Sequence, residues 1–222
     1  MTTARTFFLS AITASATLAT SNLAMPNVAT GATLTNKNTN LTASTTGWIM
    51  IFSQGTASAQ TGVGSQIAPN GVGWMDDTTN LVGQQYVAGN WSFSLGFELG
   101  VAGTFVCDVH YRAFIYNPVG PVYSQLCEAI SLAQTITNAS FNVVTATVAA
   151  SASRAFVFGE KTYLECQLDI TTNTSSANMR MQAANSGTLG NVNAQVITPG
   201  FQVPPSSLPH FVSDGGYGGV FA

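Results

Sequence analysis

The alternation of apolar and polar residues is strongest in the middle of the chain. From Trp91 to Leu99 the odd positions are large apolar residues, and the even positions are Ser92, Ser94, Gly96 and Glu98. From Phe105 to Tyr116 an apolar face that includes Val109 lies opposite a polar face with Asp108, His110 and Arg112. A period of two residues is typical of strands that bury one face. The pattern predicts two strands, each with its polar face on a solvated or partner-facing surface.

Shorter segments of similar character precede and follow these two strands. We expect further strands at Arg5–Leu9, Trp48–Phe52, Val122–Ile130, Phe141–Ala149, Arg154–Phe158, Tyr163–Thr171 and Ala177–Ala183. Only Glu128–Ile136 could be read as a helix instead. Short strands at regular intervals, with Gly and Pro between them, are typical of antiparallel sandwiches. The sequence therefore predicts an all-β fold, an antiparallel β-sandwich.

Both ends of the chain depart from this regular pattern. The first 73 residues combine a few strand-like stretches with Thr-, Ala- and Asn-rich sequence and a glycine-rich loop from Gly55 to Gly73. The last part contains four prolines, from Pro199 to Pro209, and ends in DGGYGGVFA. Such proline- and glycine-rich sequence cannot build a core by itself. We therefore expect N-terminal strands and a loop in residues 1–73, a sandwich in residues 74–190 and an extension in residues 191–222.

Charged residues are scarce, and the scarcity is greatest in the same end regions. Asp, Glu, Lys and Arg make up 7% of the 222 residues, against about 25% in an ordinary soluble domain. The first 73 residues contain only Arg5 and Lys37, and only Asp214 follows Arg180. Because charge is depleted from the cores of protein interfaces, we expect both termini to contact other proteins. The expected apolar anchors in the C-terminal extension are Phe211, Tyr217, Val220 and Phe221.

The net charge, the lengths of the apolar runs and the cysteines limit the classes of partner and the cellular compartment that we expect. A net charge of −3 provides no basic track for DNA or RNA, so we expect no nucleic-acid partner. No run reaches the 18 to 20 apolar residues, roughly, of a membrane-spanning helix, and we expect no membrane partner. The three cysteines, Cys107, Cys127 and Cys166, form no CxxC pair. We expect them to be buried free thiols, as in a protein assembled in a reducing compartment.

Reactive and metal-binding side chains are poorly placed for catalysis. Asp108 and His110 share a strand face and would lie side by side, whereas a catalytic triad needs its carboxylate on the far nitrogen of the imidazole. The other histidine, His210, is about a hundred residues away. Asp76 and Asp77 lack the alternating ligand spacing of a calcium loop. The sequence thus predicts no catalytic residue, no metal site and no cofactor.

Tryptophan side chains raise the possibility of carbohydrate binding. Trp48, Trp74 and Trp91 could in principle form a platform on which sugars stack. Trp91 begins an alternating strand, so we expect it in the core. Trp74 follows the glycine-rich loop and is the candidate for an exposed, glycan-binding aromatic residue.

Three runs resemble a pattern found in bacteriophage virion proteins with jelly-roll-like sandwiches. They are YVAGNWSFSLGFELG, VHYRAFIYNPVG and FGEKTYLECQLDITTNTSSANMRMQA, and the opening TARTFFLS is also similar. The likeness spans Tyr86–Ala183 and consists of structural positions, with no catalytic residues to carry over. It implies a jelly-roll-like fold and a place among auxiliary proteins of capsids or tails, some of which also bind glycans.

These observations lead to three hypotheses about function. The first is a virion structural protein, a capsid decoration or auxiliary surface protein that binds the assembled shell through its extended termini. Its expected partners are other virion proteins, the major capsid protein first, and further copies of itself as a homo-oligomer, with assembly in the host cytoplasm. The second is a glycan-binding host-attachment module of a phage tail or fibre. A hydrolase is the third, and it has the fewest acid and base groups to build on.

Overall fold

The computed structural model describes residues 3–9, 22–24, 35–40, 47–50, 60–61, 73–77, 81–100, 102–138, 142–150, 153–174, 178–183 and 194–202. Every regular element in these stretches is a β-strand. The described residues include no helix of the length and apolarity needed to cross a membrane.

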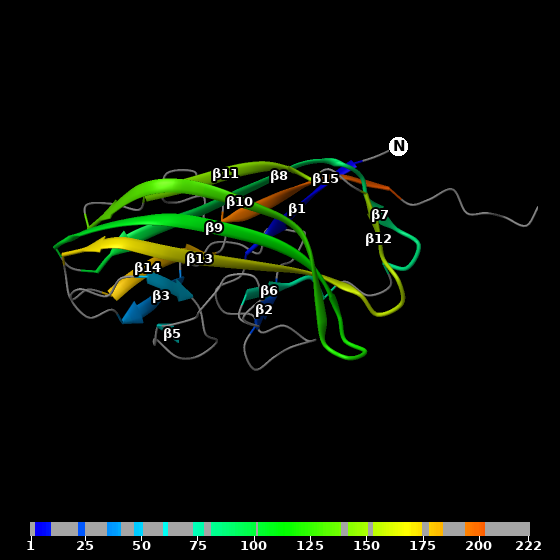
Figure 1. The fold of residues 1–222 in the computed structure, drawn as a ribbon, viewed down its shortest axis with the longest axis horizontal. Helices are drawn as coiled ribbons and strands as arrows, with labels where there is room; N and C mark the ends of the chain where they lie inside the picture. The colour runs from blue at the N-terminus through cyan, green and yellow to red at the C-terminus, as the bar shows by residue number, and fades with distance from the viewer. Residues whose placement is uncertain are drawn as a thin grey trace, which may run out of the picture.

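The strands form two sheets that pack face to face as a sandwich (Figure 1). Sheet A has eight strands: β1 (Thr3–Phe8), β3 (Thr35–Asn40), β7 (Gln85–Tyr86), β8 (Gly89–Leu99), β11 (Asn142–Ala150), β12 (Arg154–Ala155), β14 (Asn178–Ala183) and β15 (Gln195–Gln202). Sheet B has seven strands: β2 (Asn22–Ala24), β4 (Gly47–Met50), β5 (Gln60–Thr61), β6 (Gly73–Met75), β9 (Thr104–Asn117), β10 (Val122–Thr137) and β13 (Lys161–Asn173). The predicted all-β sandwich is confirmed.

Strand order places β8 inside sheet A and β9 and β13 inside sheet B, whereas β10, the longest described strand, lies at an edge of sheet B. Sheet A runs β12-β7-β15-β8-β14-β3, with β1 beside β15 and β11 beside β8. Sheet B runs β10-β9-β13-β4-β5, and β6 pairs with both β13 and β2. The pairs are antiparallel except for β2 and β6. Because β9 has β10 on one side and β13 on the other, its backbone is hydrogen-bonded along both edges.

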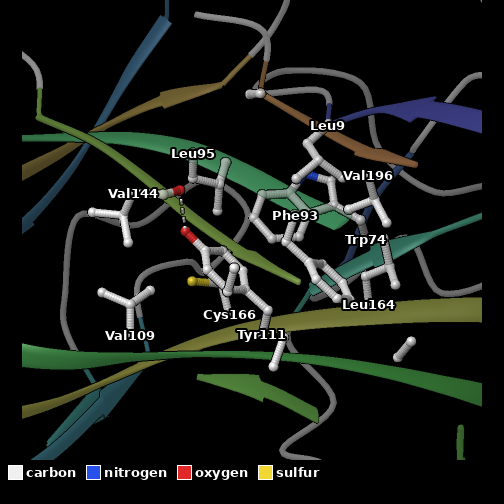
Figure 2. Packing of buried hydrophobic residues seen from close by; sticks show 14 of the residues in the cluster. Leu9, Trp74, Phe93, Leu95, Val109, Tyr111, Val144, Leu164, Cys166 and Val196 are labelled. Atoms are coloured by element: carbon white, nitrogen blue, oxygen red, sulfur yellow. Dashed lines mark hydrogen bonds between the residues drawn. The ribbon is translucent and has the colours of Figure 1, made fainter. Parts of the chain in front are cut away.

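The core lies between the two sheets and is dominated by aromatic side chains. Phe93 of β8 stacks on Tyr111 of β9 with ring centroids 5.3 Å apart and an interplanar angle of 11°, as Figure 2 shows. The Tyr111 hydroxyl donates a 2.8 Å hydrogen bond to the carbonyl oxygen of Val144 on β11. This bond satisfies the polar tip of a ring that is otherwise enclosed by apolar groups. Tyr111 therefore joins sheet B to two strands of sheet A.

The apolar faces predicted for β8 and β9 are the faces that line this core. Strand β10, by contrast, continues past Ile130 to Thr137, and the stretch that could be read as a helix is part of it. Its pairing with β9 shifts register between Gln125 and Cys127 and again between Ser131 and Gln134. Each shift changes which positions face the core. The two-residue period is therefore broken in the sequence although the strand is continuous.

Both terminal regions contribute strands to sheet A. Strand β15 falls in the predicted C-terminal extension, yet it lies between β7 and β8 and also pairs with β1. Pro199 is tolerated because the β1–β15 register shifts between Ala4 and Thr6 at this point, and proline is found at such irregularities. The Thr198 hydroxyl accepts a hydrogen bond from the backbone N–H of Arg5 there. The sandwich thus extends beyond residues 74–190.

The three cysteines are buried free thiols, as predicted. Burial raises the pKa of Cys107 and of Cys127 to about 12, and it raises the pKa of Cys166 well above its ordinary value. Because the thiolate is the reactive form, these side chains act as small apolar core residues.

We expect Phe93→Ala to lower the free energy of unfolding by about 3–5 kcal/mol, because it removes a buried ring and leaves a cavity between the sheets. Val143→Ala is the matched control: Val143 is 45% exposed, and the change should stay within about 0.5 kcal/mol. Urea unfolding followed by tryptophan fluorescence measures both. Equal losses in the two variants would contradict the assigned core.

Candidate functional site

From His110 onward the outer face of β9 is buried in the single chain, so the prediction of a solvated or partner-facing surface is wrong there, whereas Asp108 is half-buried. His110 is 9% exposed and Arg112 is 3% exposed. The ring of Trp48 on β4 lies against the His110 ring, with centroids 4.4 Å apart. Glu165 and Gln167 of β13 are buried on the same sheet. This face therefore forms a second buried layer outside sheet B.

Glu128 of β10 pairs with both basic side chains of β9. Its Oε1 atom accepts a 3.0 Å hydrogen bond from Arg112 Nε and lies 2.8 Å from His110 Nδ1. Burial by itself would raise the pKa of Glu128, but the hydrogen bonds from His110 and Arg112 outweigh it and hold the pKa below its ordinary value. Glu128 is therefore a carboxylate that balances buried positive charge.

A second buried carboxylate lies next to this group. Glu165 is paired in register with Arg112; it accepts a 2.8 Å hydrogen bond from the Tyr163 hydroxyl and a 3.2 Å bond from Gln167 Nε2. Burial, and then the charge of Glu165, raise the pKa of Tyr163 well above its ordinary value. The Tyr163 hydroxyl stays protonated and donates, so this network contributes to the packing of the outer face.

The sequence did not reveal which carboxylate contacts His110. Asp108 Oδ1 instead accepts a 2.7 Å hydrogen bond from the N–H of Ala133, a residue with a φ of 50° at the second register shift of β10. Glu128 reaches His110 and Arg112 from the neighbouring strand. The signal that could have shown this is the cross-strand register, which the two shifts of β10 hide.

Trp74 is not the exposed aromatic residue that the sequence predicted. It is 1% exposed and belongs to the core, as does Trp91 in agreement with prediction. Strand β6 pairs closely with β13, placing Trp74 opposite Leu164. A Cβ atom on Gly73 would collide with the Leu164 carbonyl oxygen, so glycine permits the approach that buries Trp74. The Trp74 ring is thus not available to stack on a sugar.

The predicted anchors Phe211, Tyr217, Val220 and Phe221 lie outside the described residues. The described chain ends at Gln202, which pairs with Gln85 at the start of β7. No group of three or more His, Cys, Asp or Glu side chains in the described stretches could hold a metal ion.

Exposed apolar side chains gather instead on three adjoining turns at one end of the sandwich. We call this surface the apolar end; its residues are Val82, Val119, Val122, Val157 and Phe158. Figure 1 shows β7, β12 and the turn between β9 and β10 toward the right of the view. The backbone N–H of Phe156 donates a 2.9 Å hydrogen bond to the carbonyl oxygen of Gln84, which joins the turn at Val82 to the turn at Phe158. A Cβ atom on Gly159 would lie 3.5 Å from Pro118 Cγ, so the turn between β9 and β10 also adjoins the turn at Phe158.

The turn that carries Phe158 is held rigidly. The Glu160 N–H donates to Val157 O, and the Val157 N–H donates back to Glu160 Oε2. Gly159 supplies the left-handed φ of 81° that the turn needs. Arg154 donates a 2.7 Å hydrogen bond to Glu160 Oε1, so these two charges neutralise each other. Phe158 is 82% exposed on this fixed backbone, and Val119 on the neighbouring turn is 79% exposed.

Large exposed apolar surfaces mark contact sites, and the exposed apolar side chains on these adjoining turns make the apolar end the candidate functional site. Its position could not be read from the sequence because its residues come from three separated segments. Within each segment only one or two of these residues occur, beside a turn. The local sequence signal for the turn that carries Phe158 is the presence of Arg154 and Glu160 on either side of it, with Gly159 between them.

Comparisons with known proteins inform the fold only. The chain matches no protein-family model and no curated protein. A crystal structure of a CocE/NonD family hydrolase from Staphylococcus aureus matches with a TM-score of 0.51 at 10% identity, over 90% of this chain. A second structure of such a hydrolase from S. aureus matches with a TM-score of 0.45 at 9% identity, again over 90% of this chain. The chain spans 37% of the length of each hydrolase chain.

At 10% identity the first match supports a shared sandwich fold alone and carries no information about activity. Neither match is to a virion protein, so the resemblance to bacteriophage proteins stays a prediction.

We expect Glu128→Gln to lower the free energy of unfolding at pH 7 by about 1–3 kcal/mol, because it weakens hydrogen bonds to buried Arg112 and His110. The folded-state pKa of Glu128 lies below its unfolded value of about 4.3, so its contribution is present above that pH and is lost as the pH falls through the folded-state pKa. Urea unfolding at pH 7 and at pH 3 should show the difference shrinking in acid. A difference that is the same at both pH values would contradict the assignment.

Proposed function

We propose that this chain is a structural protein of a virus particle, a capsid auxiliary protein held in place by protein–protein contacts. The observation that carries the proposal is the apolar end. A phenylalanine fixed on a rigid turn is solvated in the isolated chain, and it gains stability only when another molecule covers it. Fully burying one such side chain contributes about 1.5–3 kcal/mol.

The chemistry of this surface favours a protein partner. Its five defining side chains carry no charge or hydrogen-bonding group, and the adjacent Arg154 and Glu160 are already paired. Protein interfaces have central apolar or aromatic anchors with polar residues around them. Phe158 and Val119 supply such anchors, and Gln85, Asn117 and Lys161 lie nearby on the flanking strands as a half-buried polar border.

Three further features support the virion setting. The runs within Tyr86–Ala183 resemble bacteriophage virion proteins, and the chain is poor in charge at both ends. The three thiols are free and buried, which suits assembly in a reducing compartment such as a host cytoplasm. The antiparallel sandwich provides a rigid body that can be displayed on a shell while its apolar end is covered.

We expect Phe158→Ser to reduce binding to assembled particles about tenfold or more, since a central aromatic anchor is lost. Full-length protein would be mixed with particles that lack it, and the bound fraction measured by co-sedimentation. Val143→Ser, an exposed change on β11 away from the apolar end, should bind like the unchanged chain. If the unchanged chain does not sediment with particles, the proposed function is wrong; if both variants bind equally well, the apolar end is not the contact.

A further inference from the structure

We infer that the apolar end is the docking site for the C-terminal segment, residues 203–222, of a second copy of this chain. This inference rests on the proposed function: copies that bind a particle are also joined to one another through the apolar end, so loss of Phe158 weakens their binding to the particle. Copies would then join head to tail, with the segment of one covering the turns of the next.

The first argument is where the segment begins. Phe201 pairs with Tyr86 and Gln202 with Gln85, so β15 ends beside the turns of the apolar end. Phe201 is held there by ring contacts with Tyr86 and Phe156 and by the Arg5 guanidinium, 4.4 Å from its ring centroid. The starting point of the segment is therefore fixed relative to the surface that we expect it to cover on a neighbour.

The second argument is the composition of the segment. VPPSSLPHFVSDGGYGGVFA contains one charged residue, Asp214, and four large apolar side chains after Pro209 besides Val212: Phe211, Tyr217, Val220 and Phe221. Its prolines favour extended backbone, and so short an extended chain cannot bury these groups by itself. The apolar end offers what the segment lacks, which is a rigid apolar surface with few unpaired charges.

The third argument concerns which copy supplies the segment. In the isolated chain Phe158 is 82% exposed and Val119 is 79% exposed. Pro204 and Pro205 follow Gln202 almost directly, and both they and the residue before them favour extended backbone. This sequence disfavours an immediate reversal onto the turns beside Gln202, so we expect a second copy to receive the segment. An extended chain spans about 3.1 Å per residue, so twenty residues are enough to reach an adjoining copy.

Such a contact has a definite symmetry. The surface given by one copy differs from the surface received from the next, so the contact is heterologous. It produces a ring when the rotation between copies closes and an open chain when it does not. Each copy then offers one free segment and one free apolar end before closure.

The test uses three full-length variants. One is Phe158→Ser, which alters the apolar end. Another combines Phe211→Ser, Tyr217→Ser and Phe221→Ser, which alters the segment, and Val143→Ser is the control. Sedimentation velocity over a range of concentrations measures self-association, and thermal unfolding checks that each variant is folded.

The unchanged chain and the control should associate as concentration rises. The Phe158 variant and the segment variant should each associate about 30-fold more weakly, the loss expected for an anchor worth about 2 kcal/mol, which is the lower bound of a strong hot spot. Mixing these two variants should restore association, but only as a one-to-one dimer, because each supplies the part that the other lacks.

The inference is overturned if the unchanged chain stays monomeric at every concentration. It is also overturned if the Phe158 variant and the segment variant both associate as strongly as the unchanged chain. If the segment variant still associates while the Phe158 variant does not, the apolar ends contact each other and the segment is not the partner. Particle binding separates this inference from the proposed function: binding that depends on Phe158 in a monomeric chain would leave the function standing and assign the contact to another virion protein.

Discussion

The burial of β9 and β13 on both faces is the constraint on which the rest of the structure depends. Their inner faces meet sheet A through the Phe93–Tyr111 stack, and their outer faces carry Arg112, Glu165 and Gln167 out of water. Buried charged groups must be paired or hydrogen-bonded, so β10 has to supply Glu128 in the correct register. The first register shift of β10, between Gln125 and Cys127, precedes Glu128, which then lies opposite Arg112. Together the two shifts break the two-residue period of the strand.

The sequence was sufficient to predict the inner half of this arrangement. Alternation along β8 and β9 identified the core faces, because a side-chain period of two relates position directly to face. It could not identify the outer layer, since His110 and Arg112 are polar residues that would occupy a solvated face equally well. Their burial depends on contacts with Trp48 and Glu128, and such contacts between distant segments are set by strand pairing. Strand β15 was missed for a related reason: its proline suggested an extension, whereas a register shift accommodates it.

The candidate site was harder to predict than the fold. Trp74 was expected at the surface because it follows a glycine-rich loop, but the glycine before it allows the close strand pairing that buries the ring. Among the described residues the strongly exposed aromatic side chain is Phe158, which the sequence placed at the end of a short strand. Local sequence indicates that a turn is present there. It does not indicate that turns near residues 82, 119 and 158 adjoin, because that depends on the order of strands in both sheets.

The pairing of β1 with β15 places the start of one strand and the end of the other at the same end of the molecule. Thr3 lies opposite Phe201, so β1 begins and β15 ends at the end of the sandwich where the exposed turns lie. A partner that contacts the protein at this end leaves the opposite ends of β8, β9 and β13 pointing away from the contact. If the proposed contact is made at this end, sequence changes at the far ends of these strands should affect attachment least.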